Sequence, residues 1–501
     1  MQRALVLGVD AGLTMTKAAL FDEGGREVAA VSARSEISHP RPGRAERSMD
    51  GAWTSAAHAI RNVLTVAGAN SDNVAAVGLT GAMVGVWPID AEGRPVRQAI
   101  LVSDTRGQEA IDATMARDPQ VLKRIFASDG CVVEPGCTLP ALRWLFDHES
   151  ETMASARWIL TCKDWLRFRL TGEIATDETE AAVAPGDARA RGRSIDMLRL
   201  FGLDTKIELF PPILVSEAVG GYVTAAAASE TGLRAGTPVA VGAGDVPCCA
   251  LASGAADPGI ACTILGTTLH NGLIVDRPVF EPSELGLLFT LPDHLWLRVM
   301  VNLAGTSNLD WALRTFFKEE EAQSSFAKVE QMANSRPVGA GGLVYHPYLS
   351  EVGLIAPVVA RGVYAQFSGL RSGHGRADLV RAVYEGVAFS IRDCYSVMDH
   401  SISEIRLVGG GARSDFWCQM IADVLGATVI APEGNEFGAK GAALLASVAI
   451  GWWKSPREAA RRTDHVRRRF NPNERFAQAY EDAFARYRAL RATIVAQAVR
   501  G

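Results

Sequence analysis

The chain has 501 residues, of which 48% are hydrophobic and 21% charged, a composition typical of a globular protein and not of a disordered or fibrous one. This length exceeds what one hydrophobic core serves, so two or more domains are expected. A net charge of −5 gives no electrostatic case for binding nucleic acid. The eight cysteines form no C-x-x-C pair, and no stretch reads as a signal peptide or a bilayer span. We therefore expect a cytoplasmic protein without a membrane partner.

The first residues predict three strands joined by turns. Apolar residues 5–9 and 16–21 flank a turn over 10–14, and the alternating residues 27–34 follow. A helix with Asp50 as its expected cap comes next, then a strand over 74–79 and a second β-turn-β unit around 86–93.

A strand-glycine-aspartate pattern occurs twice, near residues 6–12 and again at 239–245. The repetition indicates two domains of related architecture that face each other across a cleft. We place the first domain at residues 1–243 and the second at 244–501. The basic cluster formed by Arg461, Arg462 and residues 467–469 lies near a charged C-terminal segment that predicts a helix over 474–498, and we interpret the cluster as a solvated face.

The first turn, Gly8-Val-Asp-Ala-Gly12, lies between two strands expected to be antiparallel, which excludes a Rossmann fingerprint. A tight hairpin of small residues can aim backbone N–H groups at a phosphate, and Thr14 and Lys17 add further donors. Asp10 would hold Mg²⁺ through water, because Mg²⁺ favours carboxylates and retained water. A plain β-turn with a solvent-facing aspartate is the alternative.

Asp245 follows Gly242-Ala-Gly244 at the end of an apolar strand, where its carboxylate would project into the cleft. Phosphoryl transfer needs positioning, charge neutralisation and a group that takes the hydroxyl proton, which a carboxylate can do. The alternative, a cap for the helix expected from Val246, is compatible with that role.

Two further turns suit a nucleotide. Residues 409–411 are three glycines that follow a strand and let a flat ring approach the backbone, and Gly266-Thr-Thr268 offers hydroxyls for the outer phosphates. Residues 434–441 look like a phosphate-binding P-loop, but the spacing is wrong and no Ser or Thr follows Lys440. Their small residues predict close helix packing instead.

With these pieces in this order, the chain resembles the FGGY carbohydrate kinases of the actin/hexokinase-type ATPase superfamily. The most specific segment is Ala365-x-Phe-x-Gly-Leu370 followed by Asp378-Leu and Ala382-Val-Tyr-Glu-Gly386. The resemblance implies an α/β fold of two actin-like (ribonuclease H-like) domains, with mixed β-sheets flanked by helices and the active site in the interdomain cleft. It also implies ATP and Mg²⁺ as cofactors.

The resemblance carries the family's roles onto individual residues. Asp245 falls at the catalytic base and Asp10 at the metal. The ATP contacts fall at Thr14, Lys17, Gly266, Thr267, Thr306, Asp310, Gly410, Gly411, Ala412 and Asp415. The substrate contacts fall at Met83, Val84, Asp104 and Asp245.

The substrate segment departs from the best-known patterns. Ala82, Met83 and Val84 replace the Gln-Met-His of xylulose kinases, and the Arg-Glu pair of glycerol kinases is also absent, although a site that recognises hydroxyls needs buried partners for them. Asp104 is a candidate hydroxyl acceptor or, equally, a structural partner of Arg106. The chain looks closest to kinases of L-xylulose and related ketose or keto-acid sugars, with glycerol or another polyol as the alternative substrate.

Two rival functions share the same fold, which alone does not separate them. One is a conformational ATPase that works without sugar, and the other is an inactive sugar sensor. The lack of a peptide-binding β-domain and the segment 365–386 disfavour the first, and the intact Asp245 disfavours the second. The expected partners are thus a small sugar or polyol and Mg-ATP; a homodimer is an open alternative.

Overall fold

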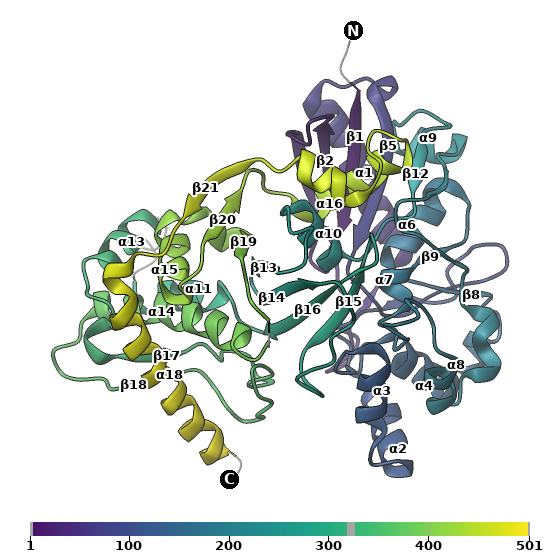
Figure 1. Cartoon of the computed structure of the whole chain (residues 1–501). Coiled ribbons are helices and arrows are strands. Elements are labelled where there is room, and N and C mark those ends of the chain that lie inside the picture. Colours follow the sequence, from purple (N-terminus) through teal and green to yellow (C-terminus); the bar gives the residue numbers. More distant parts are fainter. Residues whose placement is uncertain (1–3, 318–325, 399, 499–501) are drawn as a thin grey trace.

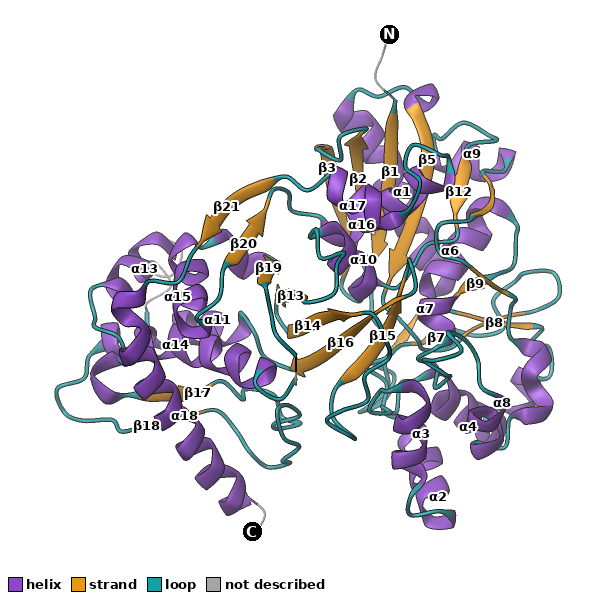
Figure 2. Cartoon of the chain, in the orientation of Figure 1, coloured by secondary structure: helices purple, strands orange, loops and turns teal. Residues whose placement is uncertain are grey.

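The structure is a computed structural model that describes residues 4–317, 326–398 and 400–498. Two lobes, each built on a mixed sheet with flanking helices, make up the described chain (Figures 1 and 2). The first sheet runs in the order β11 (Val219–Tyr222), β12 (Pro238–Ala240), β5 (Val74–Gly81), β1 (Leu5–Ala11), β2 (Met15–Asp22), β3 (Glu27–Arg34). The second runs β15 (Leu287–Leu291), β16 (Leu295–Asn302), β14 (Leu269–Val275), β13 (Ile260–Leu265), β19 (Glu404–Val408), β20 (Val429–Pro432), β21 (Val466–Phe470).

The two sheets repeat one pattern. In the first, β1, β2 and β3 are antiparallel neighbours, and β5 and β12 extend the sheet from β1 in parallel. In the second, β13, β14 and β16 are antiparallel neighbours, and β19 and β20 extend the sheet from β13 in parallel. This repetition agrees with the two related α/β units that the strand-glycine-aspartate pattern predicts.

Alternate residues of β1 face opposite sides of the first sheet, as strand geometry requires. Leu5, Leu7 and Val9 pack with α1 (Met49–Ala67), whereas Val6 packs with α16 (Phe437–Ala449). The prediction of Asp50 as the cap of α1 is wrong. Ser48 is the cap, because its side chain accepts the Gly51 N–H, and Asp50 lies in the first helical turn.

Small residues let α16 approach the first sheet closely. A Cβ on Gly8 would lie 1.9 Å from the carbonyl oxygen of Ala439, and a Cβ on Gly441 would lie 2.1 Å from that of Cys248 in α10 (Asp245–Ala252). This confirms the predicted helix packing of residues 434–441. The division into 1–243 and 244–501 remains a prediction, and α16 shows that the second segment contributes to the first lobe (Figure 1).

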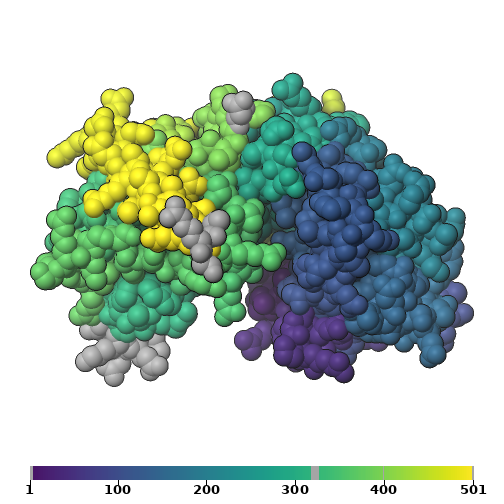
Figure 3. All heavy atoms as spheres, turned by 90° about the horizontal axis from the view of Figure 1, so that it is seen from below, coloured from purple at the N-terminus to yellow at the C-terminus, as the bar shows by residue number. Residues whose placement is uncertain are grey.

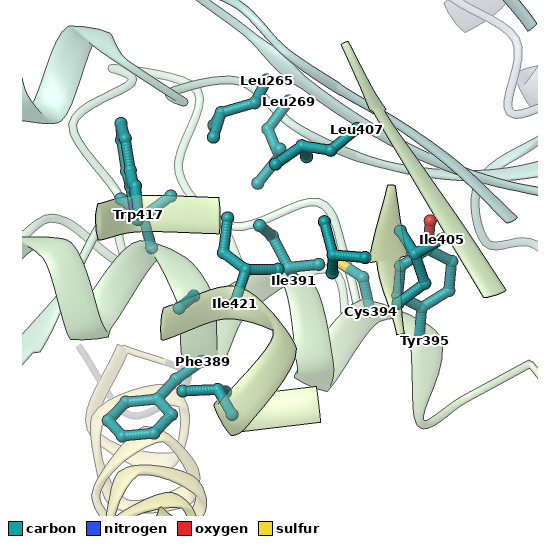
Figure 4. Close-up of a cluster of buried hydrophobic side chains, with 14 of the residues drawn as sticks. Leu265, Leu269, Phe389, Ile391, Cys394, Tyr395, Ile405, Leu407, Trp417 and Ile421 are labelled. Atoms are coloured by element: carbon teal, nitrogen blue, oxygen red, sulfur yellow. The ribbon is translucent and has the colours of Figure 1, made fainter. Parts of the chain in front are cut away.

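The core of the second lobe lies between its sheet and two helices, α14 (Arg376–Tyr395) and α15 (Asp415–Leu425). Leu265 and Leu407 point toward Ile391 and Ile421 in Figure 4, and all four are fully buried. Further helices surround this core: α11 (Ser307–Phe316), α13 (Phe326–Asn334) and α18 (Ala477–Ala498). α15 begins and ends where the sequence predicts.

Residues 99–215 add a mainly helical region to the first lobe. It contains α2 (Gln108–Arg117), α3 (Val121–Asp129), α4 (Thr138–His148), α6 (Cys162–Thr171), α7 (Glu178–Ala181) and α8 (Ile195–Leu200). The predicted second β-turn-β unit is only partly correct. Its turn forms at Asp90 to Arg94, and an antiparallel bridge joins Ile89 to Pro95 across it, but only β6 (Trp87–Ile89) is a strand and it also pairs with the distant β8 (Trp158–Leu160).

The basic cluster is divided between two elements, α17 (Pro456–Arg462) and the edge strand β21. Arg467 and Arg468 are ion-paired with Asp415, so the interpretation as a purely solvated face is incomplete. All eight cysteines are free, Cys248 and Cys249 included. Within the described ranges, we find no helix with the length and apolar character needed to cross a membrane.

Candidate active site

Asp10 lies near the end of β1, opposite Lys17 on β2 and Thr80 on β5. Burial raises the pKa of its carboxyl to about 6, although the charge of Lys17 opposes the change. Its Oδ1 is buried and has no hydrogen-bond partner among the described residues. A Cβ on Gly438 would lie 2.3 Å from its Oδ2, so a side chain at this position would displace the carboxylate.

The donor set around Asp10 fits a hydrated magnesium ion. No group of three or more His, Cys, Asp or Glu side chains within the described ranges could hold a metal ion. Mg²⁺ is commonly held by one or two carboxylates, several waters and the phosphates of its nucleotide. One unpartnered carboxylate oxygen matches that requirement.

The turn after β1 exposes Thr14, whose carbonyl accepts the Ser35 N–H. Lys17 forms an ion pair of 2.7 Å with Glu436, which precedes α16. Hydrogen bonding to that carboxylate raises the pKa of Lys17 against the opposing effect of burial. The ammonium group therefore stays charged beside the turn, where a phosphate could replace or share the carboxylate.

Asp245 is the first residue of α10 and is partly exposed. The cap position belongs to Gly244, so the alternative of Asp245 as the helix cap is wrong; its Oδ1 instead accepts the N–H of Val246 at 2.8 Å. Burial, together with the nearby charge of Asp10, raises the pKa of the Asp245 carboxyl to about 7.

The turn that carries Asp245 is fixed from two sides. Gly242 has a φ of 82°, and a Cβ there would lie 2.0 Å from the carbonyl oxygen of Leu79. Thr80 donates its hydroxyl to the Ala243 carbonyl at 2.7 Å, and Gly244 donates its N–H to Thr179 Oγ1 at 2.9 Å.

Three loops of the second lobe converge at the end of β13. Thr306 donates its N–H to the Gly266 carbonyl at 2.8 Å, and Gly305 donates to the Thr267 carbonyl at 2.7 Å. A Cβ on Gly411 would lie 2.4 Å from the side chain of Leu265. The structure thus brings together most predicted nucleotide residues of this lobe: Gly266, Thr267, Thr306, Gly410, Gly411 and Ala412.

Asp310 and Asp415 differ in their surroundings. Asp310 is exposed in the first turn of α11, directly after the Thr306 loop. Asp415 is held by Arg467 at 2.7 Å and Arg468 at 2.5 Å, and Arg467 also donates to the Ala412 carbonyl at 2.9 Å. The two arginines thus tie β21 to the glycine loop.

The residues before α16 join the two halves of the site. Arg413 of the glycine loop donates to Asn435 Oδ1 at 3.1 Å, and the neighbouring Glu436 pairs with Lys17. Phe437 also belongs to the apolar cluster against which Val246 of α10 packs. The candidate site therefore lies where the two lobes meet; from below, Figure 3 shows a recess between them.

Met83 and Val84 are buried, and Met83 lies beside the turn that carries Asp245. A Cβ on Gly244 would lie 2.4 Å from Met83 Sδ, so this side chain covers the turn that carries Asp245. Val84 donates its N–H to Glu180 Oε2 at 2.9 Å.

Asp104 is 1% exposed, and both of its oxygens are occupied. Oδ2 accepts from Ala45 N–H and from the Arg106 side chain, and Oδ1 accepts from the Arg106 backbone and side chain. Burial alone would raise the pKa of Asp104, but these hydrogen bonds outweigh it and lower the pKa. Asp104 was interpreted either as a hydroxyl acceptor or as a structural partner of Arg106, and these hydrogen bonds are those of a structural partner.

Sequence reasoning missed several residues of the site. Three of them contact predicted residues that are distant in the sequence. Glu436 pairs with Lys17, 419 positions away, and Glu180 accepts the N–H of Val84, 96 positions away. Arg467 donates to the carbonyl of Ala412, 55 positions away. No local pattern marks such partners. The acidic Thr-Asp-Glu-Thr-Glu180 run was the one visible signal, because clustered carboxylates in an otherwise apolar stretch need a reason.

Two family models match the chain. The N-terminal domain of the FGGY family of carbohydrate kinases matches residues 5–252, and the C-terminal domain of the same family matches residues 261–450. The chain belongs to the FGGY family of carbohydrate kinases. This confirms the resemblance drawn from the motifs, and the protein is a sugar kinase whose substrates are a sugar and ATP.

Curated relatives cover nearly the whole of this FGGY kinase. Erythritol kinase of Brucella abortus (strain 2308) is 30% identical over 97% of the chain and 96% of its own length. L-xylulose/3-keto-L-gulonate kinase of Escherichia coli (strain K12) is 30% identical over 97% of both. These names confirm that the kinase is near the xylulose-type sugar kinases.

Solved structures confirm the two actin-like, ribonuclease H-like domains. The structure of xylulose kinase from Rhodospirillum rubrum has a TM-score of 0.85 and 27% identity, covering 98% of this chain and 99% of that one. Gluconate kinase from Lactobacillus acidophilus has a TM-score of 0.90 over 100% of both chains, at 23% identity, and is similar in fold.

Proposed function

We propose that this kinase transfers the γ-phosphoryl group of ATP to a hydroxyl of a small ketose, with Asp245 as the general base and Asp10 beside Mg²⁺. The observation that carries the proposal is the raised pKa of two carboxyls where the two lobes meet: burial and the charge of Asp10 raise that of Asp245, and burial raises that of Asp10. Strongly shifted pKa values of this kind concentrate at functional sites.

The pKa of about 7 suits Asp245 to general base catalysis. A base is most effective when its pKa is close to the working pH, since it is then deprotonated yet still binds a proton well. The partly exposed carboxylate would accept the proton of the attacking hydroxyl as that oxygen bonds to the γ-phosphorus. The N–H of Val246 at Oδ1 keeps the carboxylate oriented.

Mg²⁺, when bound, would neutralise charge on the phosphates of ATP. Asp10 Oδ1 supplies the unpartnered oxygen that would hold the ion through water. Lys17 and the turn at Thr14 would contact phosphate oxygens, and the loops at Thr267, Thr306 and Gly411 would hold the nucleotide. Closure of the lobes would exclude water, which otherwise competes as phosphoryl acceptor.

Names of relatives support a five-carbon ketose as the substrate. Several curated relatives that cover nearly the whole chain are named as kinases of xylulose or L-xylulose. A four-carbon polyol is the second candidate, because one 30% identical relative is an erythritol kinase. Cytoplasmic location, the absence of membrane and nucleic-acid partners, and a homodimer remain predictions.

The test is ADP release from Mg-ATP with a panel of D- and L-ketopentoses, tetritols, pentitols, glycerol and keto-acid sugars. We expect one or a few compounds to raise ADP release at least tenfold over the sugar-free rate. ADP release that is appreciable but independent of every sugar would contradict the proposal and favour a conformational ATPase. Sugar binding without ADP release would favour a sensor.

A further inference from the structure

Glu180 on α7 is a buried carboxyl to which the proposed mechanism gives no role. It is 3% exposed. Its Oε2 accepts the Val84 N–H at 2.9 Å, but Oε1 has no hydrogen-bond partner among the described residues. Buried polar atoms in native proteins nearly always have a partner, so one is expected for Oε1 in a liganded state.

The position of Glu180 connects it to the catalytic turn. The preceding residue, Thr179, accepts the Gly244 N–H at 2.9 Å, and Gly244 directly precedes Asp245. Met83, next to the residue that Glu180 binds, packs over Gly244. Glu180 is thus tied both to the catalytic turn and to the segment expected to contact the substrate.

The Glu180 hydrogen bond holds Val84 in a strained conformation. Val84 has a φ of 56°, which is a rare value for a β-branched residue. Such strain persists only where surrounding contacts enforce it, and it concentrates at functional sites. Here the enforced shape lies next to Met83, which covers Gly244, the residue before Asp245.

We propose that Glu180 is a specificity-determining residue, whose free Oε1 hydrogen-bonds a substrate hydroxyl remote from the one that is phosphorylated. The inference rests on the proposed function and narrows its substrate class to polyols or ketoses that carry such a hydroxyl. Met83, Val84 and Val246 belong to one apolar cluster, and a site that recognises hydroxyls requires buried polar partners, which Glu180 would supply beside Val84.

The electrostatic surroundings are compatible with this role. Burial raises the pKa of Glu180 well above its ordinary value, Lys163 opposes the change, and Asp164 and Asp177 add to it. A protonated Glu180 can donate from Oε1 to a hydroxyl oxygen while Oε2 accepts from Val84. Lys163 is engaged by Asp164 at 2.6 Å and Asp177 at 2.9 Å.

The experiment compares four variants with the wild-type enzyme: Glu180→Met, Glu180→Ala, Glu180→Gln and Asp129→Asn. Asp129 is the matched control, a buried carboxyl that likewise accepts a backbone N–H, from Cys131. For each folded variant, kcat and KM are measured with the best substrate of the panel and with each of its monodeoxy analogues.

We expect the wild type to prefer the substrate over one deoxy analogue by about 100-fold in kcat/KM. In either apolar variant that ratio should fall below about 5-fold, mainly through a higher KM for the substrate. Glu180→Gln, which keeps a polar group at both oxygen positions, should retain most of the ratio, as should Asp129→Asn. An equal loss for substrate and all analogues would show a merely structural role and overturn the inference.

A second measurement separates this inference from the proposed function. If the wild type phosphorylates nothing in the panel, thermal stabilisation by the same compounds is measured instead. A rise in Tm with a hydroxyl compound that is lost in Glu180→Met and kept in Glu180→Gln would support Glu180 while the kinase proposal fails. No rise in wild-type Tm with any compound, or an equal rise in Glu180→Met, would overturn the inference.

Discussion

The carboxylates of the candidate site have different partners in the two lobes. Beside the nucleotide loops of the second lobe, Asp415 is ion-paired with Arg467 and Arg468, and its pKa is lowered. On the first-lobe side, one oxygen of Asp10 has no hydrogen-bond partner within the described part of the chain, and Asp245 accepts one backbone N–H. The pKa values of both are raised.

This difference indicates that the second-lobe carboxylate serves nucleotide binding and that the first-lobe carboxylates serve phosphoryl transfer. A paired carboxylate has a fixed charge and holds its loop in place, whereas a carboxylate whose pKa is raised can exchange a proton near neutral pH or accept a metal ion. We therefore expect substitutions on the first-lobe side to change turnover and substitutions at the Asp415 pair to change nucleotide affinity.

The largest expected effect is that of Asp245→Asn. Without a base the hydroxyl proton has no acceptor, so kcat should fall by about 1,000-fold, while the KM for ATP changes less than about threefold. Steady-state ADP release with the best sugar measures both. Asp129→Asn serves as the control for loss of a buried carboxyl, and a folded Asp245→Asn enzyme with near-normal turnover would show that Asp245 is not the base.

Asp10→Asn should have the next largest effect. The amide removes the negative charge that would hold hydrated Mg²⁺, so kcat/KM should fall by about 100-fold and the Mg²⁺ concentration for half-maximal rate should rise. A Mg²⁺ titration at saturating ATP measures the shift. An unchanged Mg²⁺ requirement would remove Asp10 from the metal site.

A smaller effect concerns stability and its pH dependence. The folded-state pKa of Asp245 is about 7 and its ordinary value is 3.8, so the folded state binds the extra proton between these values. The wild type therefore loses stability as the pH rises from about 4 to 7. A shift of this size corresponds to about 4 kcal/mol, which solvent screening of the partly exposed carboxyl reduces to about 2 kcal/mol, and Asp245→Asn should lack this loss at pH 8. Urea unfolding without ligands should show that difference at pH 8 and almost none at pH 4. A difference independent of pH would contradict the shifted pKa.

The smallest effect is expected in the second lobe. Arg467→Ala removes one partner of Asp415 and a donor to the Ala412 carbonyl, which loosens the glycine loop. The KM for ATP should rise about 3- to 10-fold with kcat nearly unchanged, because a partly exposed ion pair contributes only about 1 kcal/mol. A large fall in kcat instead would contradict the expectation that the second-lobe ion pair affects only nucleotide binding.

The sequence predicted the site best where it depends on local backbone. Strands, glycine turns and the aspartates that follow them are encoded within a few residues, so Asp10, Asp245 and residues 409–411 were found at the meeting point of the lobes. The partners of these residues depend on tertiary contacts. Glu436 beside Lys17 and Arg467 beside Asp415 come from distant segments that no periodicity links.

Two local predictions needed correction. Ser48 and Asp50 are both good helix-capping residues, and it is Ser48 that accepts the Gly51 N–H while Asp50 lies in the first helical turn. The strand β6 is bridged across the predicted turn, but it also pairs with β8, about 70 residues further along the chain. Local propensity cannot reveal a pairing between segments so far apart.

The most direct test of the central claim is the pH dependence of kcat/KM for the sugar. If Asp245 is the base, the profile should rise with pH through an apparent pKa near 7 and level off above it, since only the deprotonated carboxylate accepts the hydroxyl proton. The residual activity of Asp245→Asn should lack this rise. A wild-type profile that is flat between pH 5.5 and 8.5, or a rise that persists in Asp245→Asn, would contradict the account.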